Sequence, residues 1–142
     1  MTSGPAEFLD TNILIYAFST DPKSAIAEEL LAKGCATSLL GLNEFVNVAH
    51  RKLSMTWAEI RMALASIRLL CPRVLPHDIE GHELALEIAE KHRLGFFDAL
   101  MVSSALRGGC KTFWSEDMHD GLLVDGQLRI TNPFRTMSAL GT

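Results

Sequence analysis

The amino-acid sequence predicts a single α/β domain built on a parallel sheet, and three observations carry this prediction. A short apolar run ends at Asp10 and passes at once into an apolar pattern with helical spacing, as at a strand–helix junction. Further short apolar runs alternate with helical patterns to the end of the chain, as in parallel α/β folds. No internal repeat, low-complexity run or linker divides the sequence, so residues 1–142 are expected to form one domain.

Composition excludes several classes of protein. The chain has 142 residues, of which 48% are hydrophobic, and this is enough for one buried core. Its formal net charge of -4 argues against passive binding to a polyanion, which usually requires a basic surface. The sequence opens with no signal-peptide pattern, and no apolar stretch approaches the ~20 residues of a membrane span. We therefore expect a soluble, cytoplasmic protein that does not bind a membrane.

The cysteines give no sign of a metal or redox site. Cys35, Cys71 and Cys110 are odd in number and widely spaced, and they form no CxxC or zinc-ligand pattern. Buried, reduced thiols are therefore expected at all three positions.

The first strand is expected to end at Asp10. Thr11 and Asn12 follow, and either can cap the helix, which continues through Phe18 with apolar residues at helical spacing. Because ligands of open α/β sheets lie outside the carboxyl ends of the strands, Asp10 stands where a functional site would be. An aspartate that only caps the helix would occupy the same place, so Asp10 alone does not decide between these interpretations.

The later elements follow from cap and turn signals. Thr56 and Glu59 form a capping box that opens a helix, and Gly34 and Pro72 end helices. Helices are expected over residues 25–33, 42–53, 57–70, 78 or 79 to 93, and 97–106. Strands are expected over residues 35–40, 73–75 and 111–114, with one or two more between 122 and 130 around a turn at 125–126. A tail is expected from Pro133 onward.

Acidic residues stand at or near several strand–helix junctions. Asp10 ends the first strand, Glu44 is expected in the first turn of a helix, and Glu116 and Asp117 follow a late strand. Asp98 lies in the first turn of the most apolar helix, where its neighbours predict burial and an unpaired charge is costly. Each acid taken singly is explained as a favourable charge at a helix start. If they converge, a cation must relieve their repulsion, and oxygen-only ligands select Mg²⁺ or Mn²⁺, which suits phosphoryl chemistry.

Four ordered segments resemble the motifs of the PIN domain, and more closely those of the VapC-type toxins of prokaryotic toxin–antitoxin pairs. The segments are Phe8-Leu9-Asp10-Thr11-Asn12, Leu42-Asn43-Glu44-Phe45, Phe97-Asp98-Ala99-Leu100 and Ser115-Glu116-Asp117-Met118. Asn132-Pro133-Phe134 fits one branch of that group, so the resemblance covers about residues 8–134. It implies a three-layer sandwich with a central, mostly parallel sheet flanked by helices. It also implies a Mg²⁺-dependent ribonuclease, a homodimer, and inhibition by a small antitoxin from the same operon.

The resemblance implies a role for each matched polar residue. Asp10 and Asp98 would be the main metal ligands, and Glu44 and Asp117 would bind a second ion or orient water. Residues expected to hold these carboxylates or water are Thr11, Asn12, Ser115 and Glu116. Glu116 adjoins Asp117 in a loop, so the two side chains need not point the same way. The implied reaction is in-line attack of a metal-activated water on an RNA phosphodiester. The sequence departs from the family pattern at two places. Leu40-Gly41 stands where relatives often have a polar and a β-branched residue, and this change could alter substrate contacts. Ser103-Ser104 stands where relatives often have alanines.

Two other functions stay open at this point. A Mg²⁺-dependent phosphatase of the haloacid-dehalogenase class would share the Asp10-Thr11 segment, but its chemistry needs a second acid where Asn12 stands. A non-catalytic, PIN-like RNA- or protein-binding module would keep the acids for structural reasons. The complete set of acids argues against this module.

Basic residues follow Glu44 on the same predicted helix. His50-Arg51-Lys52 lies near the end of that helix, and Arg61 and Arg68 lie on the next one. These side chains either line an RNA path beside the acids or are ordinary solvated helix charges.

Overall fold

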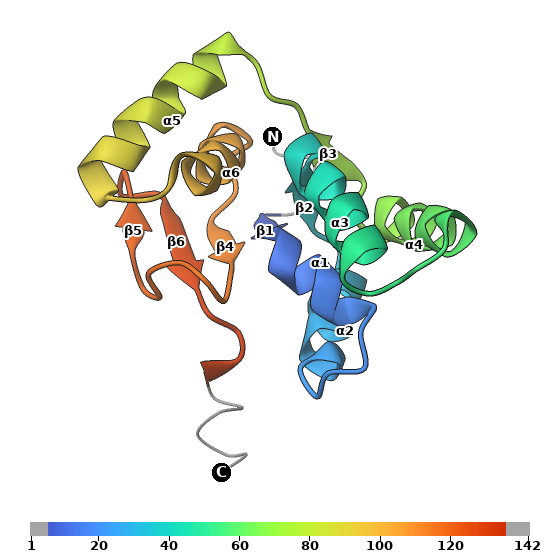
Figure 1. Cartoon of the computed structure of the whole chain (residues 1–142). Coiled ribbons are helices and arrows are strands. Elements are labelled where there is room, and N and C mark those ends of the chain that lie inside the picture. The colour runs from blue at the N-terminus through green and yellow to red at the C-terminus, as the bar shows by residue number, and fades with distance from the viewer. Residues whose placement is uncertain (1–5, 136–142) are drawn as a thin grey trace.

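A computed structural model describes residues 6–135, and at its centre lies one six-stranded sheet (Figure 1). The strands are β1 (Glu7–Leu9), β2 (Ala36–Ser38), β3 (Arg73–Leu75), β4 (Thr112–Trp114), β5 (Leu123–Val124) and β6 (Leu128–Thr131). They run in the order β3-β2-β1-β4-β6-β5, and all neighbours are parallel except β5 and β6. The predicted turn joins β5 to β6, with φ angles of 51° at Asp125 and 66° at Gly126.

Helices pack on both faces of this sheet. They are α1 (Thr11–Ala17), α2 (Ser24–Ala32), α3 (Leu39–Arg51), α4 (Trp57–Leu70), α5 (Ile79–His92) and α6 (Phe96–Arg107). One face carries α1 to α4 and the other carries α5 and α6 (Figure 1). Side chains alternate along a strand, so Phe8 packs into the core beneath α5 and α6, whereas Leu9 packs beneath α1 to α4. The predicted three-layer sandwich with a mostly parallel sheet is therefore confirmed.

Helix boundaries mostly follow the cap signals in the sequence. In α4 the capping box is complete, because Glu59 N donates to Thr56 Oγ1 at 3.1 Å and Thr56 N donates to Glu59 Oε1 at 2.8 Å. Helix α3 begins earlier than predicted, because Ser38 Oγ accepts from Gly41 N at 3.2 Å and caps the helix there. The prediction that Glu44 lies in the first turn is therefore wrong, and the helix dipole does not explain an acid in the second turn. None of the helices among the described residues is long and apolar enough to cross a membrane.

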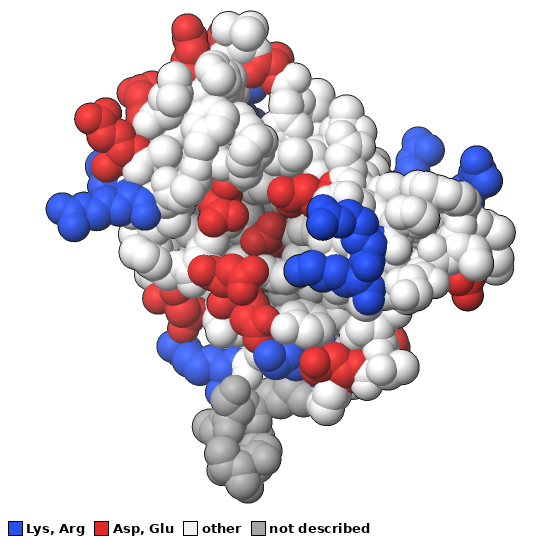
Figure 2. Space-filling model, in the orientation of Figure 1, with Lys and Arg blue, Asp and Glu red and all other residues white. Residues whose placement is uncertain are grey.

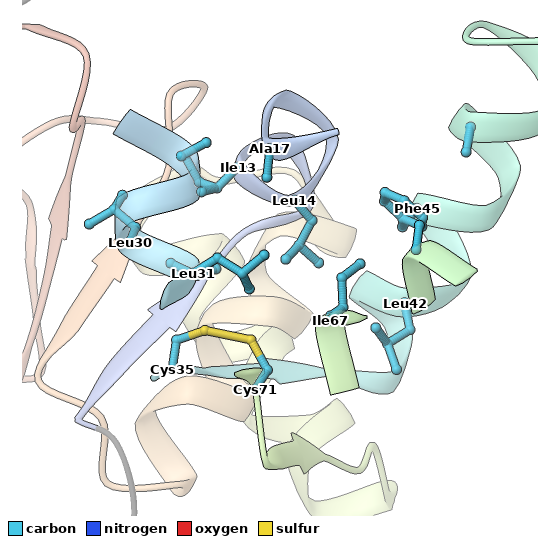
Figure 3. Packing of buried hydrophobic residues seen from close by; sticks show 14 of the residues in the cluster. Ile13, Leu14, Ala17, Leu30, Leu31, Cys35, Leu42, Phe45, Ile67 and Cys71 are labelled. Carbon is cyan, nitrogen blue, oxygen red and sulfur yellow. A yellow bond between two sulfur atoms is a disulfide. The ribbon is translucent and has the colours of Figure 1, made fainter. Parts of the chain in front are cut away.

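Two of the three cysteines differ from the prediction of separate reduced thiols. Cys35, just before β2, and Cys71, at the end of α4, form a disulfide with their Cα atoms 4.8 Å apart. Figure 3 shows this bond in the core beneath α1 to α4, beside Leu31 and Ile67. Cys110 is a free, buried thiol as expected. Wide spacing in the sequence did not reveal the pair, because the parallel pairing of β2 with β3 brings the two positions together.

The predicted tail after Pro133 begins as an ordered turn. Asn132 Oδ1 accepts from Phe134 N at 2.8 Å, and Asn132 N donates to Asp120 Oδ1 at 2.8 Å. The turn buries Phe134 to 1% exposure, with its ring edge-on to Tyr16 at 5.2 Å between centroids. The Asn-Pro-Phe segment therefore anchors the end of the sheet to α1, and residues 136–142 of the predicted tail lie outside the described residues.

Candidate active site

The predicted acids gather at the carboxyl edge of the sheet. Strands β1 and β4 are parallel neighbours in register, with Leu9 opposite Trp114, so the residues that follow them emerge side by side. Asp10 N donates to Trp114 O at 3.0 Å, which places Asp10 beside Ser115. This edge is where ligands bind in open α/β sheets.

One open cavity of about 520 Å³ collects the four acids that the sequence singled out. Its lining residues are Asp10, Thr11, Asn12, Ile15, Tyr16, Glu44, Asn47, Val48, Lys52, Asp98 and Asp117. Figure 2 shows acidic side chains drawn together in a hollow on this face, with basic side chains at one side. The acids come from four separate segments, so their convergence is a property of the fold rather than of any one helix.

Asp10 is the most buried of the four, at 6% exposure. Its Oδ1 accepts from Thr11 N at 2.7 Å, and its Oδ2 accepts from Ser115 Oγ at 2.8 Å and from Asn12 Nδ2 at 3.5 Å. Burial raises its pKa to about 7, and the charges of Asp98 and Glu44 add to the rise, although the hydrogen bonds from Ser115 and Thr11 oppose it. Asp10 does cap α1, but a carboxylate placed only as a cap would have no reason to share a cavity with three other acids.

Thr11 and Asn12 hold two of the three acids that come from elsewhere in the chain. Thr11 Oγ1 donates to Glu44 Oε1 at 2.7 Å, and Asn12 Nδ2 donates to Asp117 Oδ2 at 2.9 Å. Ser115 adds a third link, because its Oγ accepts from Asp117 N at 3.2 Å while donating to Asp10. Three of the four residues expected to hold the carboxylates, Thr11, Asn12 and Ser115, therefore each contact one or more of them.

Asp98 lies differently from its predicted position. Its apolar neighbours indicated burial, but the residue is exposed on the open side of the cavity, and Phe97 beside it is exposed as well. The prediction of burial is wrong because Asp98 and Phe97 stand in the first turn of α6 on its exposed side, whereas the buried residues of this helix begin at Ala99. Partial desolvation, then the charge of Asp117, then that of Glu44 raise its pKa above the ordinary value.

Glu116 points away from the acid cavity. Tyr16 Oη donates to its Oε1 at 2.6 Å, and Lys23 forms an ion pair with its Oε2. Its backbone N–H donates to Asn12 Oδ1 at 3.4 Å, which ties the loop to the residue that holds Asp117. Neither Tyr16 nor Lys23 was picked out from the sequence as a partner of Glu116. Only the spacing of Tyr16, one helical turn after Asn12, offered a signal.

The two departures from the family pattern are structural. Gly41 is buried, and a Cβ there would lie 2.8 Å from Thr37 Oγ1 and 3.1 Å from Met101 Cε, so it permits the close approach of α3 rather than touching a substrate. Ser103 Oγ donates to Gly81 O at 2.8 Å and Ser104 Oγ donates to Pro76 O at 3.2 Å, which fastens α6 to α5 and its approach loop. Gly41 does not line the acid cavity, and the effect of Leu40-Gly41 on substrate contacts stays a prediction.

The donor chemistry of the cavity fits a hard divalent cation. Four carboxylates line it, and Lys52 is the one basic side chain among the described residues that face it. Burial and the neighbouring carboxylates raise the pKa values of Asp10 and Asp98, and a bound cation would favour their charged forms. Within residues 6–135, however, no three His, Cys, Asp or Glu side chains stand close enough together to form a ready ligand set.

Comparison with known proteins places the chain in a family. The sequence model of the PIN domain matches residues 8–119. The fold is similar to a toxin-antitoxin complex from Klebsiella pneumoniae, with a TM-score of 0.68 and 21% identity, covering 89% of this chain and 97% of that one. It is also similar to Mycobacterium tuberculosis VapC20, a Sarcin-Ricin loop cleaving toxin, with a TM-score of 0.60 and 21% identity, covering 75% and 86%. No curated protein matches significantly. Since the family model spans most of the sequence and all the segments of the acid cavity, the chain belongs to the PIN domain family.

Proposed function

We propose that this protein is a metal-dependent endoribonuclease and the toxin of a type II toxin–antitoxin pair. The observation that carries the proposal is one cavity lined by four acids from four segments, of which Asp10 and Asp98 have raised pKa values. Membership of the PIN family and the likeness in fold to VapC20, a Sarcin-Ricin loop cleaving toxin, support RNA as the substrate.

Each side chain of the cavity has a defined part in this proposal. Asp10 and Asp98 are the main ligands for Mg²⁺, for which Mn²⁺ can substitute, and Glu44 and Asp117 bind a second ion or orient the attacking water. A cation held by these carboxylates would supply an activated water and neutralise charge on the phosphate. Residues that hold the carboxylates in place are Thr11, Asn12 and Ser115.

The reaction is hydrolysis of an RNA phosphodiester by in-line displacement. Water attacks phosphorus on the side opposite the leaving oxygen, and a carboxylate of the cavity takes up the proton of that water. The P–O3′ bond breaks, and the leaving O3′ takes up a proton from solvent. The products are a 5′-phosphate and a 3′-hydroxyl. The open shape of the cavity suits a polymeric substrate that must enter from the side.

The proposed partners are a cognate antitoxin and a second copy of the chain, acting in the cytoplasm. The toxin-antitoxin complex among the structures of similar fold supports an antitoxin. A groove between α3 and α4, lined in part by Leu39, Leu42, Val46 and Leu64, offers an apolar face to a helix of such a partner. Ile13 of α1 is fully buried and contributes nothing to this surface.

A cleavage assay with a matched control tests the function. The purified protein should cut RNA with Mg²⁺ or Mn²⁺, and EDTA should stop it. Asp98→Asn should remove activity, whereas Asp125→Asn, the same chemical change in the β5–β6 turn, should leave activity intact. Folded protein that binds RNA but never cuts it with either cation would instead support a non-catalytic binding module.

A further inference from the structure

An exposed aromatic stack lies between the end of α3 and the start of α4. The rings of His50 and Trp57 are 4.2 Å apart between centroids, with an interplanar angle of 21°. Both residues are exposed, and Trp57 keeps 53% of its surface open although one ring face rests on His50. A large aromatic ring that stacks on a partner and still has 53% of its surface exposed is an unusual feature for a surface with no binding role.

Two cations stand beside this stack. Arg51 and Lys52 follow His50 directly, and both are exposed. Neither takes part in an ion pair with any residue between 6 and 135, unlike Lys23 and Arg107, which do. Lys52 also lines the acid cavity, and Figure 2 shows basic side chains next to the acidic hollow. Their charge is therefore available to an anion that enters the cavity.

The segment from His50 to Lys52 links the stack to the cavity, because His50 belongs to the stack and Lys52 lines the cavity. Asn47 lines the cavity, and His50 and Arg51 lie three and four positions after it, on the adjoining surface of the helix. From Glu44 to His50 the helix rises about 9 Å, which keeps the stack within a short reach of the acids. We name these five side chains the aromatic–basic strip: Asn47, His50, Arg51, Lys52 and Trp57.

We propose that the aromatic–basic strip binds single-stranded RNA beside the scissile phosphate. This inference rests on the proposed function. It adds the position of the RNA on the protein and specifies that the RNA is single-stranded. A nucleobase stacks on the open face of Trp57, and the phosphates on either side contact Arg51 and Lys52, the combination that single-strand binding proteins use. A base inside a duplex has no free face to offer, so the strip selects loops or unpaired segments.

The negative charge of the protein explains why RNA binding needs a basic surface beside the cavity. The chain has a formal net charge of -4, and four carboxylates line the cavity, so RNA is repelled at the point where it must be cut. Arg51 and Lys52 offset this repulsion locally, and stacking adds an attraction that salt does not screen. The polyanion complements Arg51 and Lys52, which favours RNA over an apolar protein partner at this surface.

Intrinsic fluorescence tests the stacking directly and without any cleavage. The chain has two tryptophans, so Trp114→Phe leaves Trp57 as the sole reporter. In EDTA at low salt, an adenosine tetranucleotide is expected to quench Trp57 emission, and an abasic ribose-phosphate oligomer of the same length is not. Circular dichroism of Trp114→Phe confirms that the reporter protein is folded.

Binding of the same tetranucleotide to variants measures the size of the effect. Trp57→Ala should weaken binding by about 5- to 150-fold, the range for loss of one base stack, and Trp57→Phe should recover most of it. Met62→Ala, which removes an apolar side chain of 73% exposure from the same helix, should leave binding unchanged. Lys52→Ala should lower both the affinity and its dependence on salt.

The outcomes separate this inference from the proposed function. No quenching, together with unchanged binding by Trp57→Ala in a protein that cuts RNA, would overturn the strip and leave the nuclease standing. Loss of oligomerisation or of antitoxin binding in Trp57→Ala, with RNA binding intact, would identify a protein interface and also overturn it. Quenching in a protein that never cuts RNA would support the strip and refute the nuclease.

Discussion

Replacing Asp10 with asparagine is expected to raise the stability of the metal-free protein at pH 8, although it alters a buried polar residue. Asparagine keeps the size of the side chain and an oxygen that can accept from Thr11 N, so the cap of α1 is retained. The substitution removes a negative charge that is disfavoured by burial and by the neighbouring acids Asp98 and Glu44. The expected gain therefore comes from the electrostatics of the cavity and not from better packing.

The magnitude follows from the pKa of Asp10, which rises from 3.8 to about 7 on folding. Between these values the folded state holds a proton that the unfolded state has released, so the free energy of unfolding falls as the pH rises. At about 1.4 kcal/mol per pH unit, the full loss is about 4 kcal/mol, reached above pH 7. Below about pH 4 the acid is neutral in both states and the two proteins should have similar stabilities.

Melting curves in EDTA between pH 4 and pH 8 test this expectation. Asp10→Asn should melt about 10 °C above wild type at pH 8, and the gap should close as the pH falls. Asp78→Asn is the control of opposite sign, because the hydrogen bond from Arg107 lowers the pKa of Asp78 and its contribution is lost as the pH falls. If Asp10→Asn melts below wild type at pH 8 by an amount that does not change with pH, Asp10 is a satisfied helix cap and the reasoning is refuted.

Three further outcomes are expected. Glu116→Gln should leave Mn²⁺ affinity unchanged but lower kcat, because Glu116 orients the loop before Asp117 through its contacts with Tyr16 and Lys23. A large loss of Mn²⁺ affinity would show instead that Glu116 is a metal ligand. Phe134→Ala should cost about 3–5 kcal/mol in denaturant unfolding, since the ring is buried, and a smaller loss would mean that the Asn-Pro-Phe turn is dispensable. Adding a reductant should lower the melting temperature of wild type but not of a variant lacking both cysteines of the disulfide, which should itself be about 2–4 kcal/mol less stable.

Much of the fold was predictable because local signals and tertiary structure agree. The capping box at Thr56 and Glu59, the strand–Asp10–helix junction and the hairpin turn at Asp125-Gly126 each occur where the sequence placed them. Such features depend on hydrogen bonds between residues close in sequence, so they can be read without knowing the fold. The early start of α3 was missed because Ser38 ends a strand and caps the helix at once.

The candidate site was predictable in its membership but less so in its geometry. The order of motifs placed Asp10, Glu44, Asp98 and Asp117 together, and all four line one cavity. The direction of the Glu116 side chain was not predictable, because it depends on Lys23, a partner 93 positions away in the sequence. The disulfide was missed for the same reason, since Cys35 and Cys71 come close together only when β2 pairs with β3.

Direct titration of Mn²⁺ into the purified protein at pH 8 tests the central claim that the acids form a divalent-cation site. Wild type should bind Mn²⁺, and Asp98→Asn should bind it at least about tenfold more weakly while remaining folded. Asp125→Asn should bind as wild type does. If Asp98→Asn binds Mn²⁺ with wild-type affinity and stoichiometry, the carboxylates in this cavity do not share an ion and the account is contradicted.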